Sequence, residues 1–194
     1  MDVRYMAGDL DKASKADLAK RLTDVLIRME GGANTHGGRA FASVLFSELP
    51  KGDWWVGGVA DDSFVSAPGR FLVNVTIPEG YMNADHKSEV HAWVNEAILA
   101  ATHADKATGS SILVVINEVT EGNWGNAGHP ISLESIADSV GMSKTGERFA
   151  WVRSYYAAKA RMFAAFNYPG DLGGLLPSQQ MSKSLDSKTT HPAL

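Results

Sequence analysis

The sequence predicts an α/β (α+β) fold in which tandem β-α-β units form a four-stranded mixed sheet with two helices on one face, followed by a C-terminal helical extension. Two observations carry this prediction: an internal repeat, and apolar residues at helical spacing between short apolar runs. The 194 residues are 44% hydrophobic and include no cysteine, which is typical of a globular chain that buries a core without disulfides.

The second half of the chain repeats the first. The matching segments are 15–27 with 87–99, 43–49 with 113–119, and 52–58 with 122–128. In the first pair, lysine, acidic and apolar positions coincide without a gap. A glycine closes the extended run before each helix, Gly8 in the first half and Gly80 in the second. Each half therefore carries the same order of strand, helix, strand and glycine-rich hairpin.

The segments 15–27 and 87–99 are predicted to be amphipathic helices, because their apolar residues recur at helical spacing between charged ones. These residues are Leu18, Leu22, Val25 and Leu26 in the first helix, and Val90, Val94, Ala97 and Ile98 in the second. The flanking segments are rich in Val, Ile, Leu and Phe, as buried strands are. A right-handed β-α-β crossover covers one face of the sheet, so we expect an oligomer contact on the other.

The pattern changes after Gly128. Ser132 is predicted to cap a short helix that runs through Val140, and a longer helix is predicted from Thr145 or Gly146 to Phe166. The longer helix has two apolar stripes: Trp151, Tyr155, Ala158, Met162 and Phe166 form one, and Phe149, Val152, Tyr156 and Phe163 form the other. We therefore expect it to be buried on more than one side, against the sheet edge or a neighbouring subunit.

The predicted domain organisation follows from the repeat. Residues 1–128 form one domain of two units, 1–58 and 70–128, residues 129–170 form a helical extension, and residues 171–194 form a flexible tail. Within the first unit, after the helix at 15–27, Gly31-Gly32 is predicted to stop that helix and Gly37-Gly38 to form a flexible turn.

Charge and composition exclude several function classes. The 18 basic and 22 acidic residues give a net charge of −4, so we expect neither nucleic acid nor a membrane surface as a partner. No apolar run is long enough to span a bilayer, and the missing cysteine fits the cytoplasm. His86 and His91 lie five residues apart, which does not place both on one helical face, so no metal site is expected.

Three short motifs are the most specific features of the doubled unit. They are Leu22-Thr23-Asp24, Phe46-Ser47-Glu48-Leu49-Pro50 and Gly52-Asp53-Trp54-Trp55-Val56-Gly57-Gly58-Val59. With them, residues 1 to about 128 resemble the 4-oxalocrotonate tautomerase superfamily. The doubled unit is similar to its fused members, such as the cis-3-chloroacrylic acid dehalogenase and related tautomerases.

The resemblance implies a homotrimer that moves protons next to the carbonyl group of a small carboxylate, without metal or organic cofactor. In the family an amino-terminal proline, kept neutral by its surroundings, acts as the base. Arginines hold the substrate carboxylate, and an aromatic side chain from the hairpin walls the pocket.

Few of these family residues are found at the matching positions. Counted back from Gly8, the proline would lie two residues before Met1, and its counterpart in the second half is Phe71. The positions of the family's arginines are occupied by Asp9 and Tyr81 after the first strand, and by Ser43 and Leu113 on the second. The aromatic wall carries over as Trp54 and Trp124.

Three interpretations remain open. In the first, the gene product starts upstream with a proline, other arginines (Arg39, Arg70 or Arg4) hold the substrate, and the protein interconverts keto and enol forms of a small 2-oxo carboxylate. In the second, the catalytic amine has been lost, and the protein is a binding or assembly subunit on a tautomerase scaffold. In the third, it is a hydratase or decarboxylase of three-carbon acids, which the family also includes.

Overall fold

The structure, a computed structural model, describes residues 1–31, 34–104 and 108–180. Its elements are β1 (Asp2–Met6), α1 (Lys12–Met29), α2 (His36–Phe41), β2 (Leu45–Leu49), β3 (Phe71–Pro78), α3 (Ala84–Ala101), β4 (Ile112–Val119), β5 (Gly125–Asn126), β6 (His129–Pro130), α4 (Leu133–Ser139) and α5 (Glu147–Ala165). They belong to two compact units: unit 1 comprises residues 1–76 and 84–117, and unit 2 comprises residues 77–83 and the chain from residue 118 onward.

The four main strands form one mixed sheet in the order β2-β1-β3-β4. β1 pairs parallel with β2 and antiparallel with β3. β3 and β4 run in the same direction, because the Phe71 N–H donates to the Ser111 carbonyl at one end and the Glu79 N–H donates to the Val119 carbonyl at the other. The predicted mixed sheet of two β-α-β units is therefore confirmed.

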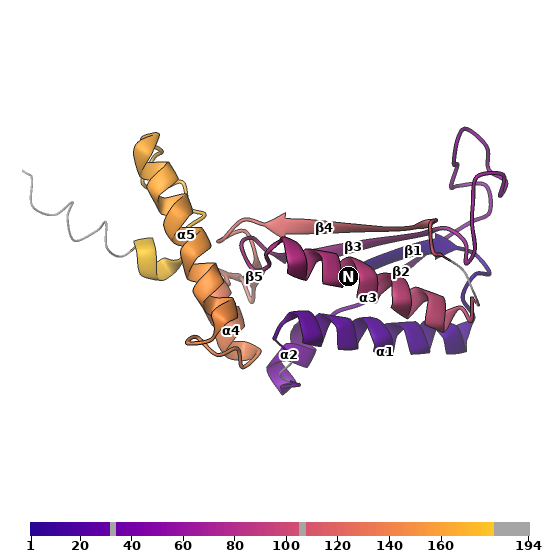
Figure 1. The fold of residues 1–194 in the computed structure, drawn as a ribbon, viewed down its shortest axis with the longest axis horizontal. Coiled ribbons are helices and arrows are strands. Elements are labelled where there is room, and N and C mark those ends of the chain that lie inside the picture. Colours follow the sequence, from indigo (N-terminus) through magenta and orange to yellow (C-terminus); the bar gives the residue numbers. More distant parts are fainter. Residues whose placement is uncertain (32–33, 105–107, 181–194) are drawn as a thin grey trace, which may run out of the picture. The chain divides into compact units, whose positions relative to one another are not determined.

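The core of unit 1 lies between the sheet and two helices. α1 and α3 run side by side on one face of the sheet (Figure 1). The buried strand residues on this face include Val3, Tyr5, Phe71, Val73 and Val75, and the helices bury Leu18, Leu22, Val90, Val94 and Ile98 against them. The predicted apolar stripes are thus the faces that pack. Leu45, Leu113 and Val115 remain 63%, 55% and 43% exposed.

The backbone repeats as closely as the sequence. Each half ends in a two-residue hairpin turn with positive φ at both positions, at Gly57-Gly58 (61° and 84°) and at Ala127-Gly128 (51° and 81°). The glycines that close the first strands, Gly8 and Gly80, also have positive φ, as do Gly52 and Gly122 before the hairpins. These positions suit glycine because other side chains are strained there. The internal repeat therefore describes structure and not composition alone.

Unit 2 is organised around the two helices that follow the repeat. The Ser132 side chain accepts from the Ser135 N–H and caps α4, and α5 begins directly after Gly146, as predicted. The buried face of α5 carries Phe149, Val152 and Tyr156. Other buried side chains of the unit are Tyr81, Met82, Leu133, Ile136 and Val140.

A polar cluster fixes α5 to the end of β3. Lys159 Nζ lies 2.8 and 2.7 Å from the two carboxylate oxygens of Glu79, and the Tyr155 hydroxyl donates to the same carboxylate at 2.6 Å. The Tyr156 hydroxyl donates to the Glu79 carbonyl at 2.9 Å. Burial opposes the charge of Glu79, but these hydrogen bonds and the Lys159 charge outweigh it and lower the pKa of the carboxyl.

α5 buries Phe149, Val152 and Tyr156, while Trp151, Met162 and Phe166 are 40%, 45% and 73% exposed in the single chain, so packing of α5 against a neighbour stays a prediction. Two details differ from the sequence-based expectations. Gly37 and Gly38 do not form a flexible turn: they lie in α2, whose first turn is capped by the Thr35 hydroxyl. The described part of the expected flexible tail also packs, because Leu175 and Leu176 are buried. Residues 181–194 of that segment lie outside the described residues.

No helix in the described ranges is long and apolar enough to cross a membrane.

Replacing Gly80 with alanine tests how tightly α5 closes on the end of β3. A Cβ here would lie 2.3 Å from Cδ1 of Tyr155, whereas a Cβ at Gly8 meets nothing within 4 Å. Both glycines have positive φ, so Gly8→Ala measures the backbone cost that the two substitutions share. In urea unfolding, we expect Gly80→Ala to lose about 1–3 kcal/mol more than Gly8→Ala because of overpacking. Equal losses would contradict the packing.

Candidate functional site

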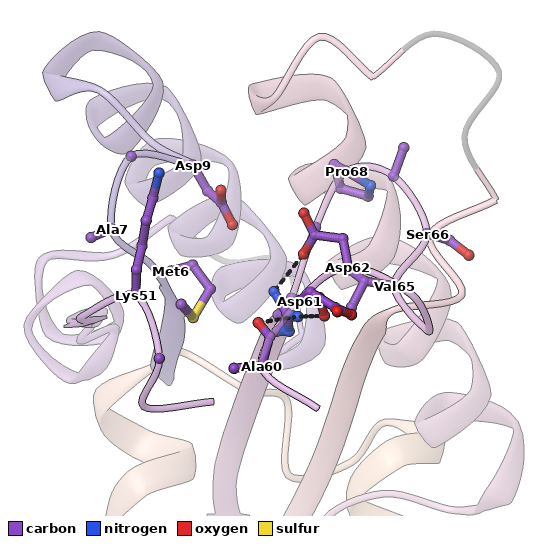
Figure 2. A pocket seen from close by; sticks show the side chains of 15 residues that line it. Met6, Ala7, Asp9, Lys51, Ala60, Asp61, Asp62, Val65, Ser66 and Pro68 are labelled. Carbon is purple, nitrogen blue, oxygen red and sulfur yellow. Dashed lines mark hydrogen bonds and ion pairs between the residues drawn. The ribbon is translucent and has the colours of Figure 1, made fainter. Parts of the chain in front are cut away.

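The β3 pocket, a cavity of about 570 Å³, opens between the end of β1 and the segment that leads into β3. It is lined by residues 6–9, 51–52, 60–62 and 65–70, all within unit 1. In Figure 2, Asp9 and Lys51 lie on one side of the cavity and Asp61 and Asp62 on the other. The pocket is thus a mixed-charge site of a size that suits a small molecule.

The register of the sheet places this pocket at the amino end of β3. Tyr5, near the carboxyl end of β1, lies opposite Phe71, the first residue of β3. β3 is the counterpart of β1 in the repeat. The pocket at the amino end of β3 is therefore the counterpart of the position at the amino end of β1. Phe71 is an internal residue, and its backbone nitrogen is not a base; the chemistry of the pocket comes from side chains.

Arg70 is the buried cation of the pocket wall. Its Nη1 lies 2.7 Å from Asp62 Oδ1, and its Nη2 donates to the carbonyls of Ala60, at 3.2 Å, and Asp61. The Arg70 side chain is 7% exposed, while its partner Asp62 is 81% exposed. Arg70 Nε is buried without a hydrogen-bond partner. Arg70 therefore holds the loop 60–62 in place and keeps one donor unused.

Asp9 is a carboxyl of the pocket whose pKa is raised. Burial raises its pKa above the ordinary value of 3.8, and the nearby Asp62 charge adds to the shift. A Cβ on residue 69 would lie 2.8 Å from Asp9 Oδ2, so Gly69 allows the carboxylate to approach the backbone. A carboxyl whose pKa is moved toward neutrality is a better proton acceptor than an ordinary one.

Asp61 behaves in the opposite way. Its carboxylate accepts from the side chain and the backbone N–H of Ser63, at 2.5 and 3.0 Å, and these hydrogen bonds lower its pKa. Neighbouring carboxyls of one pocket are therefore shifted in opposite directions, one by desolvation and one by hydrogen bonding.

A second candidate position lies at the amino end of β1. The α-amine of Met1 donates to the Ser43 carbonyl at 2.6 Å, and the Met1 carbonyl accepts from the Leu45 N–H at 2.9 Å. Burial lowers the pKa of this amine below its ordinary value of 8.0, against the opposing effect of the Asp2 charge. The position therefore favours a neutral amine, which can accept a proton.

The three candidate arginines lie in different places. Arg70 is in the β3 pocket, at the other end of β1 from Met1. Arg4 lies on β1, is 50% exposed and contacts Asp2 at 3.2 Å. Arg39 lies on α2, is exposed and donates from Nε to Asn34 Oδ1 at 2.7 Å. Arg39 lies four residues before Ser43, whose carbonyl accepts from the Met1 amine.

The two candidate tryptophans lie in the two repeated hairpins. Trp54 is half-buried and precedes the hairpin closed by Val56 and Val59 in unit 1. Trp124 is half-buried and lines a hollow of about 300 Å³ formed by residues 122–130 in unit 2. Their matching positions confirm the repeat; neither lines the β3 pocket.

Sequence reasoning missed Asp9, Lys51 and Asp62 as pocket residues. Asp9 was recognised only as the residue that stands where the family has an arginine. Asp61 and Asp62 lie in the linker between the two halves, which has no counterpart in the repeat. Within the described ranges no group of three or more His, Asp or Glu side chains is placed to hold a metal ion.

Comparisons with known proteins agree with this architecture. Residues 72–134 match the family model described as Tautomerase enzyme. A fused 4-OT described as a wild-type symmetric trimer is 24% identical, with a TM-score of 0.54 over 69% of this chain and 95% of that chain. The chain has the fold of the fused 4-oxalocrotonate tautomerases. No curated protein matches it.

Two further structures share this fused 4-oxalocrotonate tautomerase fold. A member of the cis-3-chloroacrylic acid dehalogenase family is 18% identical, with a TM-score of 0.54 over 67% of this chain and 81% of its own. A protein inactivated by 2-oxo-3-pentynoate is 21% identical, with a TM-score of 0.55 over 69% of this chain and 96% of its own. The resemblance inferred from the sequence motifs is thereby confirmed at the level of the fused fold.

Asparagine substitutions at Asp9 and Asp61 test the electrostatics of the β3 pocket. The pKa of Asp9 is higher in the folded state than in the unfolded state, so the folded state holds this proton more tightly. The stability of the wild type that comes from Asp9 is therefore lost as pH rises above about 3.8. Asp9→Asn should therefore gain stability relative to the wild type as pH rises from 3 to 7.

The folded state lowers the pKa of Asp61, so its contribution is present at neutral pH and is lost on acidification. Asp61→Asn should lose stability relative to the wild type as pH rises over the same range. Urea unfolding at each pH measures both variants, and shifts of the same sign would contradict the assignment.

Proposed function

We propose that the protein is an isomerase that interconverts the keto and enol forms of a small 2-oxo carboxylate by proton transfer. The observation that carries this proposal is the mixed sheet of two β-α-β units, in which the amino end of β1 is hydrogen-bonded beside Ser43. The match of residues 72–134 to tautomerase enzymes supports the same reaction class. Arginine or lysine side chains would hold the substrate carboxylate and the developing enolate.

The base in this proposal is an amino-terminal proline that would precede Met1. The Met1 amine and carbonyl both face β2 through hydrogen bonds to Ser43 and Leu45. Two further residues would extend this edge by roughly 7 Å in a strand. Arg39 is our first candidate for the carboxylate, because α2 leads directly into Ser43. Trp54 follows the carboxyl end of β2, at the opposite end of the sheet from Met1, so it would wall this pocket only from a neighbouring subunit. No metal or organic cofactor takes part.

The assembly in this proposal is a homotrimer in the cytoplasm. The sheet of unit 1 leaves Leu45, Leu113 and Val115 exposed, and such apolar side chains favour a contact between subunits. A fused 4-OT with this fold is described as a symmetric trimer. Sedimentation should give a species of three chains of 20.8 kDa each, whereas a monomer at all concentrations would contradict the assembly.

A second candidate function is a tautomerase-like binding or assembly protein. One observation favours it: four positions that carry arginine in the family hold Asp9, Tyr81, Ser43 and Leu113 here. Tyr81 is also 1% exposed, so it contributes to the core of unit 2 and not to a substrate surface. The test of the base distinguishes the two candidates.

The test compares three chains: the numbered chain, the chain extended so that processing exposes Pro-x-Met1, and a matched extension that exposes Ala-x-Met1. Ketonisation of phenylpyruvate is followed in the ultraviolet. We expect the proline form to be about 100-fold faster than the alanine form, which is a typical contribution of general base catalysis. Equal rates in all three chains would exclude the amine as the catalyst and favour the binding protein.

The role of Arg39 is tested in the proline form. Arg39→Gln should raise KM and lower kcat/KM about tenfold to 100-fold, the loss expected when a charge-assisted carboxylate contact is removed. Arg21→Gln is the matched control, because Arg21 is exposed on α1 and contacts Asp17. Identical kinetics for the Arg39→Gln and Arg21→Gln chains would remove Arg39 from the site.

A further inference from the structure

The β3 pocket contains two charged side chains that are not paired within the pocket wall. Of its charged residues, Arg70 pairs with Asp62, and the Asp61 carboxylate accepts hydrogen bonds from the residue two positions along. The remaining two, Asp9 and Lys51, are exposed and form no ion pair with each other or with another residue that the structure describes. One negative and one positive charge are therefore left over in the cavity.

The wall between these two charges is open. Asp9 and Lys51 lie on the same side of the cavity (Figure 2). Asp9 follows Gly8 and Lys51 precedes Gly52, and a Cβ on either glycine would meet nothing within 4 Å. The cavity of about 570 Å³ thus has room for a small molecule beside both charged groups.

The second half of the repeat shows the same two positions closed. Their counterparts are Tyr81 and Glu121, which are 1% and 7% exposed. The ring of Tyr155 fills the space over Gly80, where a Cβ would lie 2.3 Å from it, and the Glu121 carboxylate accepts from the Leu133 N–H at 3.0 Å. Residues that follow the repeat therefore occupy this place in unit 2, whereas the matching positions of unit 1 line a cavity.

The charges of the pocket indicate which ligand it suits. An anion alone would be repelled by the Asp9 carboxylate, and a cation alone would be repelled by Lys51 and by the buried Arg70. Arg70 Nε is also buried without a hydrogen-bond partner, so the hydrogen bonding of the pocket wall is incomplete. A molecule that carries both an ammonium and a carboxylate group matches the two unpaired charges.

We propose that the β3 pocket binds a small zwitterion of the amino acid class, whose ammonium contacts Asp9 and whose carboxylate contacts Lys51. Both contacts are charge-assisted hydrogen bonds. The site binds without catalysing proton transfer at an amine, because the nitrogen of Phe71 is a peptide nitrogen. The inference is independent of the proposed isomerase reaction, which is placed at the amino end of β1.

The first experiment titrates the full chain calorimetrically with four probes of three carbons each: L-alanine, β-alanine, propionate and propylamine. We expect at least one of the two amino acids to bind about tenfold or more tightly than propionate and propylamine, each of which lacks one of the two charges. Equal binding of propionate would overturn the proposal in favour of an anion site, and equal binding of propylamine in favour of a cation site. No binding of either amino acid would overturn it outright.

Substitutions test the two contacts separately. Asp9→Asn and Lys51→Gln should each weaken binding of the amino acid about tenfold or more, because each removes the charge of one contact. Asp53→Asn and Lys20→Gln are the matched controls, since both residues are exposed and neither lines the pocket. Unchanged affinity in Asp9→Asn and Lys51→Gln, or the same loss in the controls, would contradict the assignment.

A second measurement locates the ligand in the wild-type chain, so it does not depend on the folding of any variant. In ¹⁵N–¹H NMR spectra, we expect the amide signals of Gly8 and Gly52 to shift on addition of the amino acid, because they adjoin Asp9 and Lys51. The amide of Gly80, the counterpart of Gly8, should stay in place. Binding that leaves the Gly8 and Gly52 signals unmoved would overturn the site.

Discussion

The antiparallel pairing of β1 with β3 is the constraint on which the rest of unit 1 depends. It places Val3 opposite Val73 and Tyr5 opposite Phe71, so that buried side chains of both halves share one face. A slip of one residue would turn every one of these side chains to the other face. The two β-α-β units therefore join in one register, and α1 and α3 meet on the same side of the sheet.

The same pairing separates the two potential sites of the molecule. Because β1 and β3 run in opposite directions, their amino ends lie at opposite ends of the paired segment. One end offers an amine of lowered pKa beside Ser43, and the other offers the β3 pocket with Asp9 and a buried Arg70. The amino ends of β1 and β3 are equivalent positions in the repeat, but the side chains around them differ and give them different chemistry.

The repeat also explains how much could be predicted from the sequence. The strand order, the two helices and the hairpins followed from it, because a glycine at residue 8, 52 or 58 and its counterpart in the second half impose the same positive φ. The helix boundaries near Ser132 and Gly146 followed from capping and spacing. Features set by repeated local signals were therefore accessible.

Features that are set by tertiary contacts could not be predicted from the sequence. The β3 pocket depends on Asp61 and Asp62, whose linker has no counterpart in the repeat, and on the fold of that linker around Arg70. Gly37 and Gly38 suggest a turn in the sequence, but they lie in α2, whose first turn is capped by Thr35. The two stripes of α5 are equivalent in sequence, whereas in the structure Phe149 and Tyr156 are buried and Phe166 is exposed.

The proposed base would extend from the amino end of β1, where desolvation lowers the pKa of the Met1 amine. The most direct measurement is a pH titration of the α-amine of the numbered chain by ¹⁵N-detected NMR. We expect a pKa below the ordinary value of 8.0, returning to that value when the chain is unfolded in urea. A pKa at or above 8.0 in the folded chain would contradict it.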